Sequence, residues 1–133
     1  GTGLAYVPEI KALCAVLLRE GFDVWVIDGE NQKVLEIAAA GCGIDASRVV
    51  GIRNGHDKEK LTDQILNPIP IRTGKVEVVT SFIGRPPRLV VSGIADDAEI
   101  LKFGAGLRVV IDRRDPLFRV LALEKGWLLQ PPF

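Results

Sequence analysis

Three short polar stretches of the sequence follow runs of apolar residues, and all three carry carboxylates. They are Asp28-Gly29-Glu30-Asn31, Ser92 to Asp97, and Asp112-Arg113-Arg114-Asp115. If the apolar runs are parallel strands, these stretches meet at the carboxyl edge of the sheet, where open α/β sheets bind ligands. The helix that begins at Lys75 is expected near the same edge. Carboxylates bind Mg²⁺ and an ammonium group pairs with phosphate oxygens, so the set is typical of a metal and phosphate site.

The same residues also have an ordinary structural interpretation. Asp96 and Asp97 in the first turn of a helix would each stabilise it by about 0.3–1 kcal/mol through the helix dipole. Asp115 before a proline is a common helix cap. Gly41-Cys42-Gly43 and Gly104-Ala105-Gly106 follow predicted helices, so they are expected to be helix ends and not dinucleotide-binding loops. Spacing alone leaves the functional and structural interpretations open.

Hydrophobic periodicity predicts alternating helices and strands. The expected helices are Pro8 to Gly21, Gln32 to Ala40, Lys75 to Ile83, one that starts at Asp96 or Asp97, and Leu117 to Lys125. The expected strands are Phe22 to Ile27, Val49 to Ile52, Leu89 to Val91, Leu107 to Ile111, and Trp127 to Leu129. This alternation predicts an α/β fold with a Rossmann-like, mostly parallel sheet and helices on both faces.

One segment interrupts the alternation. Residues 54–73 are charged at first and then rich in proline, which predicts a surface loop or a small hairpin, with His56 in contact with solvent. The whole chain is expected to form a single domain over residues 1–133, with this segment as an irregular insertion.

Composition limits the partners. The chain has 17 Lys and Arg against 17 Asp and Glu, so no overall field attracts nucleic acid or an anionic membrane. No apolar run approaches a membrane span, and no signal peptide is evident, so a soluble, cytoplasmic protein is expected. Cys14 and Cys42 are too few for a disulfide scaffold and are predicted to be buried free thiols.

In order and spacing, four segments resemble the haloacid dehalogenase-like (HAD) phosphatase superfamily, particularly its phosphoserine-phosphatase-like branch. The segment PEIKALCAVLLREGFDVWVID looks like the helix and strand that lead to the second motif, and GCGIDASRVVGIR like the next strand region. The segment TGKVEVVTSFIGRPP looks like the third motif, which carries a lysine, and RLVVSGIADDAEIL like the fourth. The resemblance implies a small phosphorylated ligand, an aspartate nucleophile and acids that hold Mg²⁺.

The resemblance assigns roles to individual residues. Lys75 matches the lysine that contacts the phosphoryl group, and Asp97 matches the later acid of the fourth motif, with Asp96 beside it as a second metal candidate. Gly93 stands where the first metal-binding aspartate belongs. Asp28 stands where Ser or Thr is expected, and its negative charge would oppose phosphate binding. Weak Mg²⁺ binding by Asp28, Asp96 and Asp97 is a hypothesis, and Glu30 is a weaker site candidate.

The D-x-D strand that carries the family's nucleophile has no counterpart before Pro8, because GTGLAYV contains no acid. In the family this strand lies in the middle of the sheet. Without it, the strands at Val24–Ile27 and Leu89–Val91 would pair directly, or another chain or segment would fill the place.

Three hypotheses follow. The first is a catalytically inactive pseudoenzyme that serves as a binding or regulatory module, or as a fragment of a larger protein. The second is a Mg²⁺-dependent phosphomonoester hydrolase completed by another segment or chain. The third is a structural module that forms a homo-oligomer through an exposed sheet edge.

Overall fold

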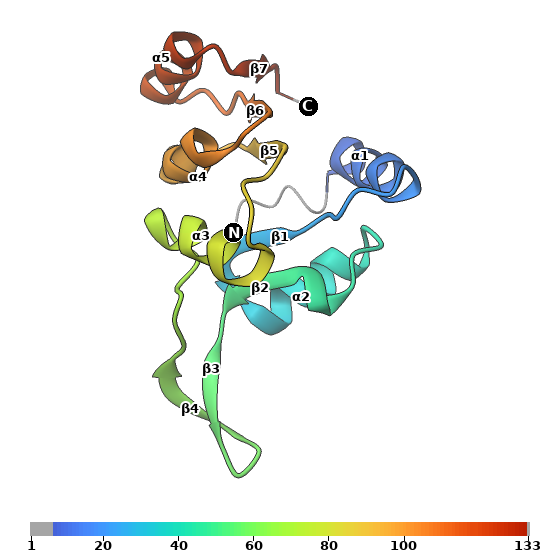
Figure 1. Ribbon diagram of the computed structural model, residues 1–133, viewed down its shortest axis with the longest axis vertical. Coiled ribbons are helices and arrows are strands. Elements are labelled where there is room, and N and C mark those ends of the chain that lie inside the picture. Colours follow the sequence, from blue (N-terminus) through green and yellow to red (C-terminus); the bar gives the residue numbers. More distant parts are fainter. Residues whose placement is uncertain (1–6, 133) are drawn as a thin grey trace. The chain divides into compact units, whose positions relative to one another are not determined.

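The computed structural model describes residues 7–132. They divide into two compact units, the first ending at Pro70 and the second beginning at Ile71, and each is described by itself (Figure 1). The single domain predicted from the sequence stays a prediction. The segment in which no D-x-D strand is found lies almost wholly in residues 1–6, outside the described residues.

The first unit begins with an α/β arrangement. Its elements are α1 (Pro8–Arg19), β1 (Val26–Asn31), α2 (Gln32–Ala40), a 3₁₀ turn (Ala46–Arg48) and β2 (Val49–Ile52). β1 and β2 are parallel, with Val26 opposite Val49. The core cluster contains Cys14, Leu35, Ala39, Cys42, Ile44 and Val49. One face of α1 is turned toward this core, with Cys14 buried and Ile10, Leu13 and Leu17 partly buried.

β1 differs from the strand that the sequence predicts. The run Phe22 to Ile27 indicates an early strand followed by a polar turn, whereas β1 begins at Val26 and includes all of Asp28–Asn31. The register shifts after Ile27, and Asn31 pairs with Ile52. Gly51 permits this close approach, because a Cβ there would lie 2.5 Å from the carbonyl oxygen of Glu30. Backbone pairing therefore extends the strand beyond its apolar residues.

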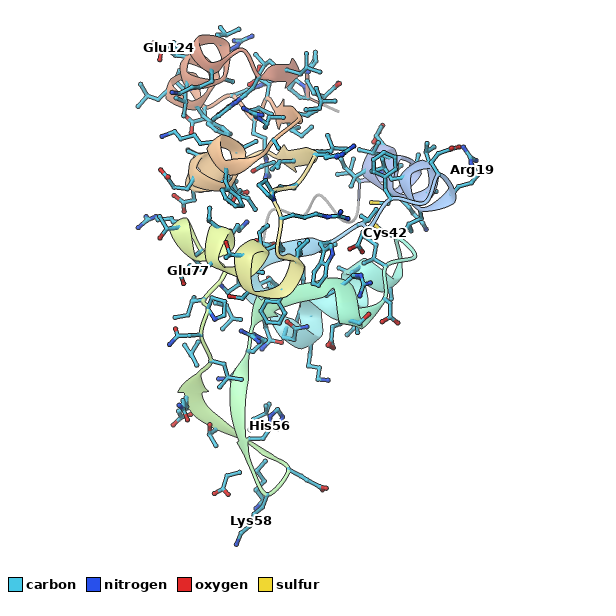
Figure 2. All side chains as sticks on the ribbon, viewed as in Figure 1. Arg19, Cys42, His56, Lys58, Glu77 and Glu124 are labelled. Atoms are coloured by element: carbon cyan, nitrogen blue, oxygen red, sulfur yellow. The ribbon has the colours of Figure 1, made fainter. Side chains whose placement is uncertain are left out.

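Residues 54–65 form the small hairpin that was one of the two expectations for this segment. β3 (Asn54–Asp57) and β4 (Lys60–Ile65) are antiparallel. The tight turn uses Lys58 and Glu59, both with positive φ. His56 is exposed on β3 (Figure 2).

The second unit holds a three-stranded sheet. α3 (Thr73–Val78) continues as a π-helix (Val79–Ile83), and then come β5 (Leu89–Ser92), a 3₁₀ turn (Ala95–Asp97), α4 (Ala98–Phe103), β6 (Leu107–Ile111), α5 (Pro116–Lys125) and β7 (Leu128–Gln130). The sheet is parallel in the order β5-β6-β7. Asp115 caps α5 as expected, since its carboxylate accepts a hydrogen bond from the Phe118 backbone N–H. α3 starts two residues before Lys75, so the lysine lies in its first turn.

The mixed α/β fold with parallel sheets is confirmed. The described strands form three separate sheets, β1-β2, β3-β4 and β5-β6-β7. Among the described residues these ladders do not include direct pairing of the strands that contain Ile27 and Leu89, which was one of the two alternatives. Within residues 7–132, none of the helices combines the length and apolar character needed to cross a bilayer.

Candidate functional site

The carboxyl end of β5 carries a buried polar pair. Ser92 is the last residue of the strand, and the chain then turns through Gly93 into the 3₁₀ turn that contains Asp97. The Ser92 hydroxyl donates a hydrogen bond of 2.5 Å to Oδ2 of Asp97 and accepts one of 3.2 Å from the Ile94 backbone N–H. Ser92 and Asp97 are 2% and 4% exposed. The strand end therefore orients a carboxylate that water barely reaches.

Lys75 completes this site from the first turn of α3. Its Nζ lies 2.6 Å from Oδ1 of Asp97, and both side chains are nearly buried. Oδ1 receives no well-directed hydrogen bond in the described part of the chain, so the contact is an ion pair. A buried charge is tolerated when an opposite charge compensates it, which accounts for the pairing. We call Lys75, Asp97 and Ser92 the strand-end cluster.

Lys75 keeps N–H donors beyond its ion pair with Asp97. An ammonium group carries three N–H donors, so an ion pair with one carboxylate leaves donors for a phosphoryl oxygen. In a site that excludes water, such a charge-assisted contact is stronger than at the surface. Because Ser92 and Lys75 engage the two oxygens of Asp97, this carboxylate positions the lysine.

Two neighbouring acids, Asp96 and Asp112, make contacts with arginines outside the strand-end cluster. Asp96 is exposed, and its Oδ1 lies 3.5 Å from Nε of Arg72. Asp112, after β6, accepts a hydrogen bond from the Arg114 backbone N–H and lies 3.4 Å from Arg119. The structure thus brings Lys75 and Asp97 together but does not direct Asp96 to the same contact.

The residues of the second unit do not fit the Mg²⁺ ion that the resemblance implies. Gly93 offers no ligand, and a Cβ at this position would lie 2.7 Å from Cδ of Arg113. Asp97 already compensates Lys75, and Asp96 pairs with Arg72. In residues 7–132 no three His, Cys, Asp or Glu side chains are grouped to hold a metal ion. Hard cations need several oxygen ligands, and this arrangement supplies one acid that is already engaged.

Asp28 and Glu30 belong to the first unit and make local contacts. The Asp28 carboxylate accepts a 2.8 Å hydrogen bond from the Gly29 backbone N–H, and Glu30 accepts one of 2.9 Å from Asn31. Asn31 caps α2 by accepting hydrogen bonds from Lys33 and Val34. These carboxylates therefore help to shape the turn from β1 into α2.

Sequence reasoning assigned no role to Ser92. The signal available was a hydroxyl at the end of a predicted strand, five residues before a candidate acid. That signal is weak, because the hydrogen bond depends on the turn at Gly93 and on the 3₁₀ turn that follows.

Comparisons with known proteins give a fold. No protein-family model matches the sequence, and no curated protein matches it. A conserved, functionally unknown protein from Anaerococcus prevotii is similar in structure, with 21% identity and a TM-score of 0.77 over 92% of this chain and 36% of that one. A protein of unknown function from Bordetella pertussis has 17% identity and a TM-score of 0.79, over 90% of this chain and 56% of that one.

A third similar structure has a descriptive name. It is a phosphoserine phosphohydrolase-like protein from Francisella tularensis, with 14% identity and a TM-score of 0.67 over 96% of this chain and 62% of that one. The chain therefore spans less than two thirds of the length of each of these proteins. At such identities the likeness concerns the fold alone, which is similar to that of a phosphoserine phosphohydrolase-like protein.

Proposed function

We propose that this chain is a phosphatase-type domain that binds a small phosphorylated ligand through Lys75 and does not hydrolyse it. The observation that carries the proposal is the ion pair of 2.6 Å between Lys75 and Asp97, buried at the carboxyl end of β5. Ligands of open α/β sheets bind at that edge. An ammonium group held there by a carboxylate is prepared to contact a phosphate oxygen.

The engagement of Asp97 argues against catalysis by this cluster. To attack a phosphorus atom, Asp97 would have to release one of its carboxylate oxygens from the contact that it makes in the structure. Asp97 is paired with Lys75 on one oxygen and accepts a hydrogen bond from Ser92 on the other. Asp97 therefore supports Lys75 and does not serve as the nucleophile.

The fold supports a phosphomonoester as the ligand class. The similar protein from Francisella tularensis is described as phosphoserine phosphohydrolase-like. Phosphoserine and inorganic phosphate are therefore suitable first probes, since they present the same dianionic group with and without a substituent.

A second candidate function follows from the lengths of the similar proteins. The chain covers 36%, 56% and 62% of the three solved structures. A Mg²⁺-dependent phosphomonoester hydrolase, in which another segment or chain supplies the nucleophile and the metal ligands that the second unit lacks, is consistent with that observation. Lys75 would then contact the same phosphoryl group during hydrolysis.

The test of the proposal measures binding and hydrolysis separately. Phosphorus NMR of inorganic phosphate and phosphoserine, with increasing amounts of protein, would report binding. Hydrolysis of p-nitrophenyl phosphate, with and without Mg²⁺, would report activity. We expect line broadening of both phosphates and no hydrolysis. Broadening should disappear in the double variant Lys75→Met with Asp97→Asn, which replaces the ion pair with neutral side chains of similar size.

The matched control is Lys102→Met, which removes an exposed lysine of α4 that lies 3.7 Å from Glu99. This variant should bind phosphate as the parent chain does. Absence of broadening at millimolar phosphate would overturn the binding proposal. Hydrolysis that requires Mg²⁺ and is lost in Lys75→Arg would overturn the non-catalytic part and favour the second candidate.

A further inference from the structure

The two cysteines of the chain lie against one another in the first unit. Cys14 is on α1, and Cys42 is in the turn after α2. Both are buried free thiols, as the sequence predicts, and both belong to the same core cluster. The thiol of Cys14 is hydrogen-bonded to that of Cys42. Figure 2 labels Cys42, whose sulfur is drawn in yellow. Both thiols therefore lie in one small buried cluster that joins α1 to the turn after α2.

We propose that Cys14 and Cys42 form a redox site, in which a small-molecule disulfide converts the two thiols into one intramolecular disulfide. The proposal concerns the first unit and is independent of the phosphate site. It rests on the burial of both thiols in the same core cluster and on their position in two different elements.

The surroundings of Cys42 allow the small movement that bond formation needs. A disulfide requires its sulfur atoms about 2.05 Å apart, with a defined dihedral angle. Cys42 lies between Gly41 and Gly43, both exposed, and Gly43 has a φ of 76°. Glycines place few steric limits on the backbone, so the Cys42 side chain can be re-aimed without moving the core strands.

The position of Cys14 on α1 determines how a disulfide would affect the structure. Cys14 is the buried residue of α1, while Val16 and Leu18 are 43% and 37% exposed. A bond to Cys42 would fix α1 to the end of α2. Oxidation should therefore stabilise the position of α1, chiefly by constraining the unfolded chain.

The exchange balances without further reactants. The thiolate of Cys42 attacks one sulfur of the small disulfide, forms a mixed disulfide and releases one small thiolate. The thiolate of Cys14 then attacks the Cys42 sulfur and displaces the second small thiolate. The protein loses two electrons and two protons, which the two departing thiols carry. Burial and the adjacent Cys42 raise the pKa of the Cys14 thiol, so the second step is slow at neutral pH.

The experiment uses the full chain and oxidised glutathione. After incubation and an acid quench, the free thiols are alkylated in denaturant and the protein is measured by mass spectrometry and on a non-reducing gel. We expect a monomer with no alkylated cysteine, a mass lower by about 2 Da, and a thermal midpoint higher by roughly 5–10 °C. A reductant should reverse all three changes.

Matched variants separate this result from other oxidation products. Cys14→Ser and Cys42→Ser each keep one thiol, so each should form a glutathione adduct at most and show no rise in the thermal midpoint. The denatured parent chain serves as a positive control for the oxidant. Two free thiols in the native chain under conditions that oxidise the denatured chain would overturn the proposal. So would glutathione on both cysteines or a disulfide-linked dimer.

Discussion

Each unit contains a serine hydroxyl bonded to an aspartate, and the two pairs differ in burial. In the first unit, the Ser47 backbone N–H donates a 2.9 Å hydrogen bond to Oδ2 of Asp45, the Ser47 side chain also bonds to this carboxylate, and Asp45 is exposed. In the second unit, Ser92 donates to Asp97, and both residues are buried. The lysines repeat the contrast, because Lys33 meets Glu36 at the surface whereas Lys75 meets Asp97 in the interior.

The two pairs differ in the free energy that is needed to remove their polar groups from water. An exposed pair exchanges its contacts with water at little cost, so it serves local structure, as Asp45 does at the start of a 3₁₀ turn. A buried pair must compensate its own desolvation. The strand-end cluster bears that cost at a sheet edge where ligands bind, and this is why it is the stronger candidate for function.

The largest expected effect comes from breaking the buried ion pair. Lys75→Met should lower the free energy of unfolding by about 3–5 kcal/mol, because it leaves Asp97 buried without an opposite charge. Lys33→Met removes a surface contact and should cost less than about 0.5 kcal/mol. Urea denaturation followed by the fluorescence of Trp25 and Trp127, one in each unit, would measure both. Equal losses in the two variants would remove the contrast between the pairs.

The Ser92 hydroxyl gives the next largest effect. Ser92→Ala removes a hydrogen bond to a buried carboxylate and should lower the free energy of unfolding by about 1.5–3 kcal/mol. The same denaturation experiment measures the loss. If the variant is as stable as the parent chain, Asp97 does not need the serine. The role of Ser92 would then be limited to the turn at Ile94.

The sequence predicts much of the fold where local signals agree. α2, β2 and β6 have the predicted bounds, because their periodicity coincides with a cap such as Asn31 or with a short β-branched run. β1 was misplaced, since its second half depends on the approach of Gly51 to Glu30 and not on apolar residues. Long-range backbone pairing of this kind leaves no local pattern.

The candidate site was predictable only in part. The choice of Lys75 and Asp97 came from the order of motifs, and the structure places the two residues in contact. Their assignment to phosphate and metal binding stays a prediction. The contacts of Ser92 with Asp97 and of Cys14 with Cys42 arise from tertiary packing, so neither spacing nor composition indicates them.

Gly51, inside β2, and Gly93, directly after β5, should differ in how well they tolerate a side chain. Gly51→Ala would place a Cβ 2.5 Å from the backbone oxygen of Glu30, which cannot move without distorting β1, so we expect a loss of about 1–3 kcal/mol. Gly93→Ala meets the flexible side chain of Arg113, and its cost should be smaller. Thermal denaturation would compare them. If Gly93→Ala lowers the stability more than Gly51→Ala does, the Arg113 side chain is fixed in place. Adding Arg113→Ala to Gly93→Ala should then recover the lost stability.

The smallest effect on stability is expected for the exposed pair of Ser47 and Asp45, where a substitution changes mainly the pKa of Asp45. The hydrogen bond from the Ser47 side chain is the largest of the causes that hold the pKa of Asp45 below its ordinary value, followed by the bond from the Ser47 backbone N–H. Ser47→Ala removes the first and keeps the second, so the pKa of Asp45 should rise and remain lowered. An NMR titration of the Asp45 carboxyl measures this change.

The sign of the linked stability effect follows from the lowered pKa. A carboxyl with a lowered folded-state pKa stabilises the fold above its unfolded pKa and loses that contribution as the pH falls through the folded value. Ser47→Ala should therefore make the first unit slightly less stable at neutral pH, and its difference from the parent chain should disappear as the pH falls below the folded-state pKa of Asp45. Arg48→Met is the control, because the Arg48 charge lowers the pKa of Asp45 less than the Ser47 contacts do. If Arg48→Met raises this pKa more than Ser47→Ala does, charge and not hydrogen bonding governs the exposed pair, and its likeness to Ser92 and Asp97 is lost.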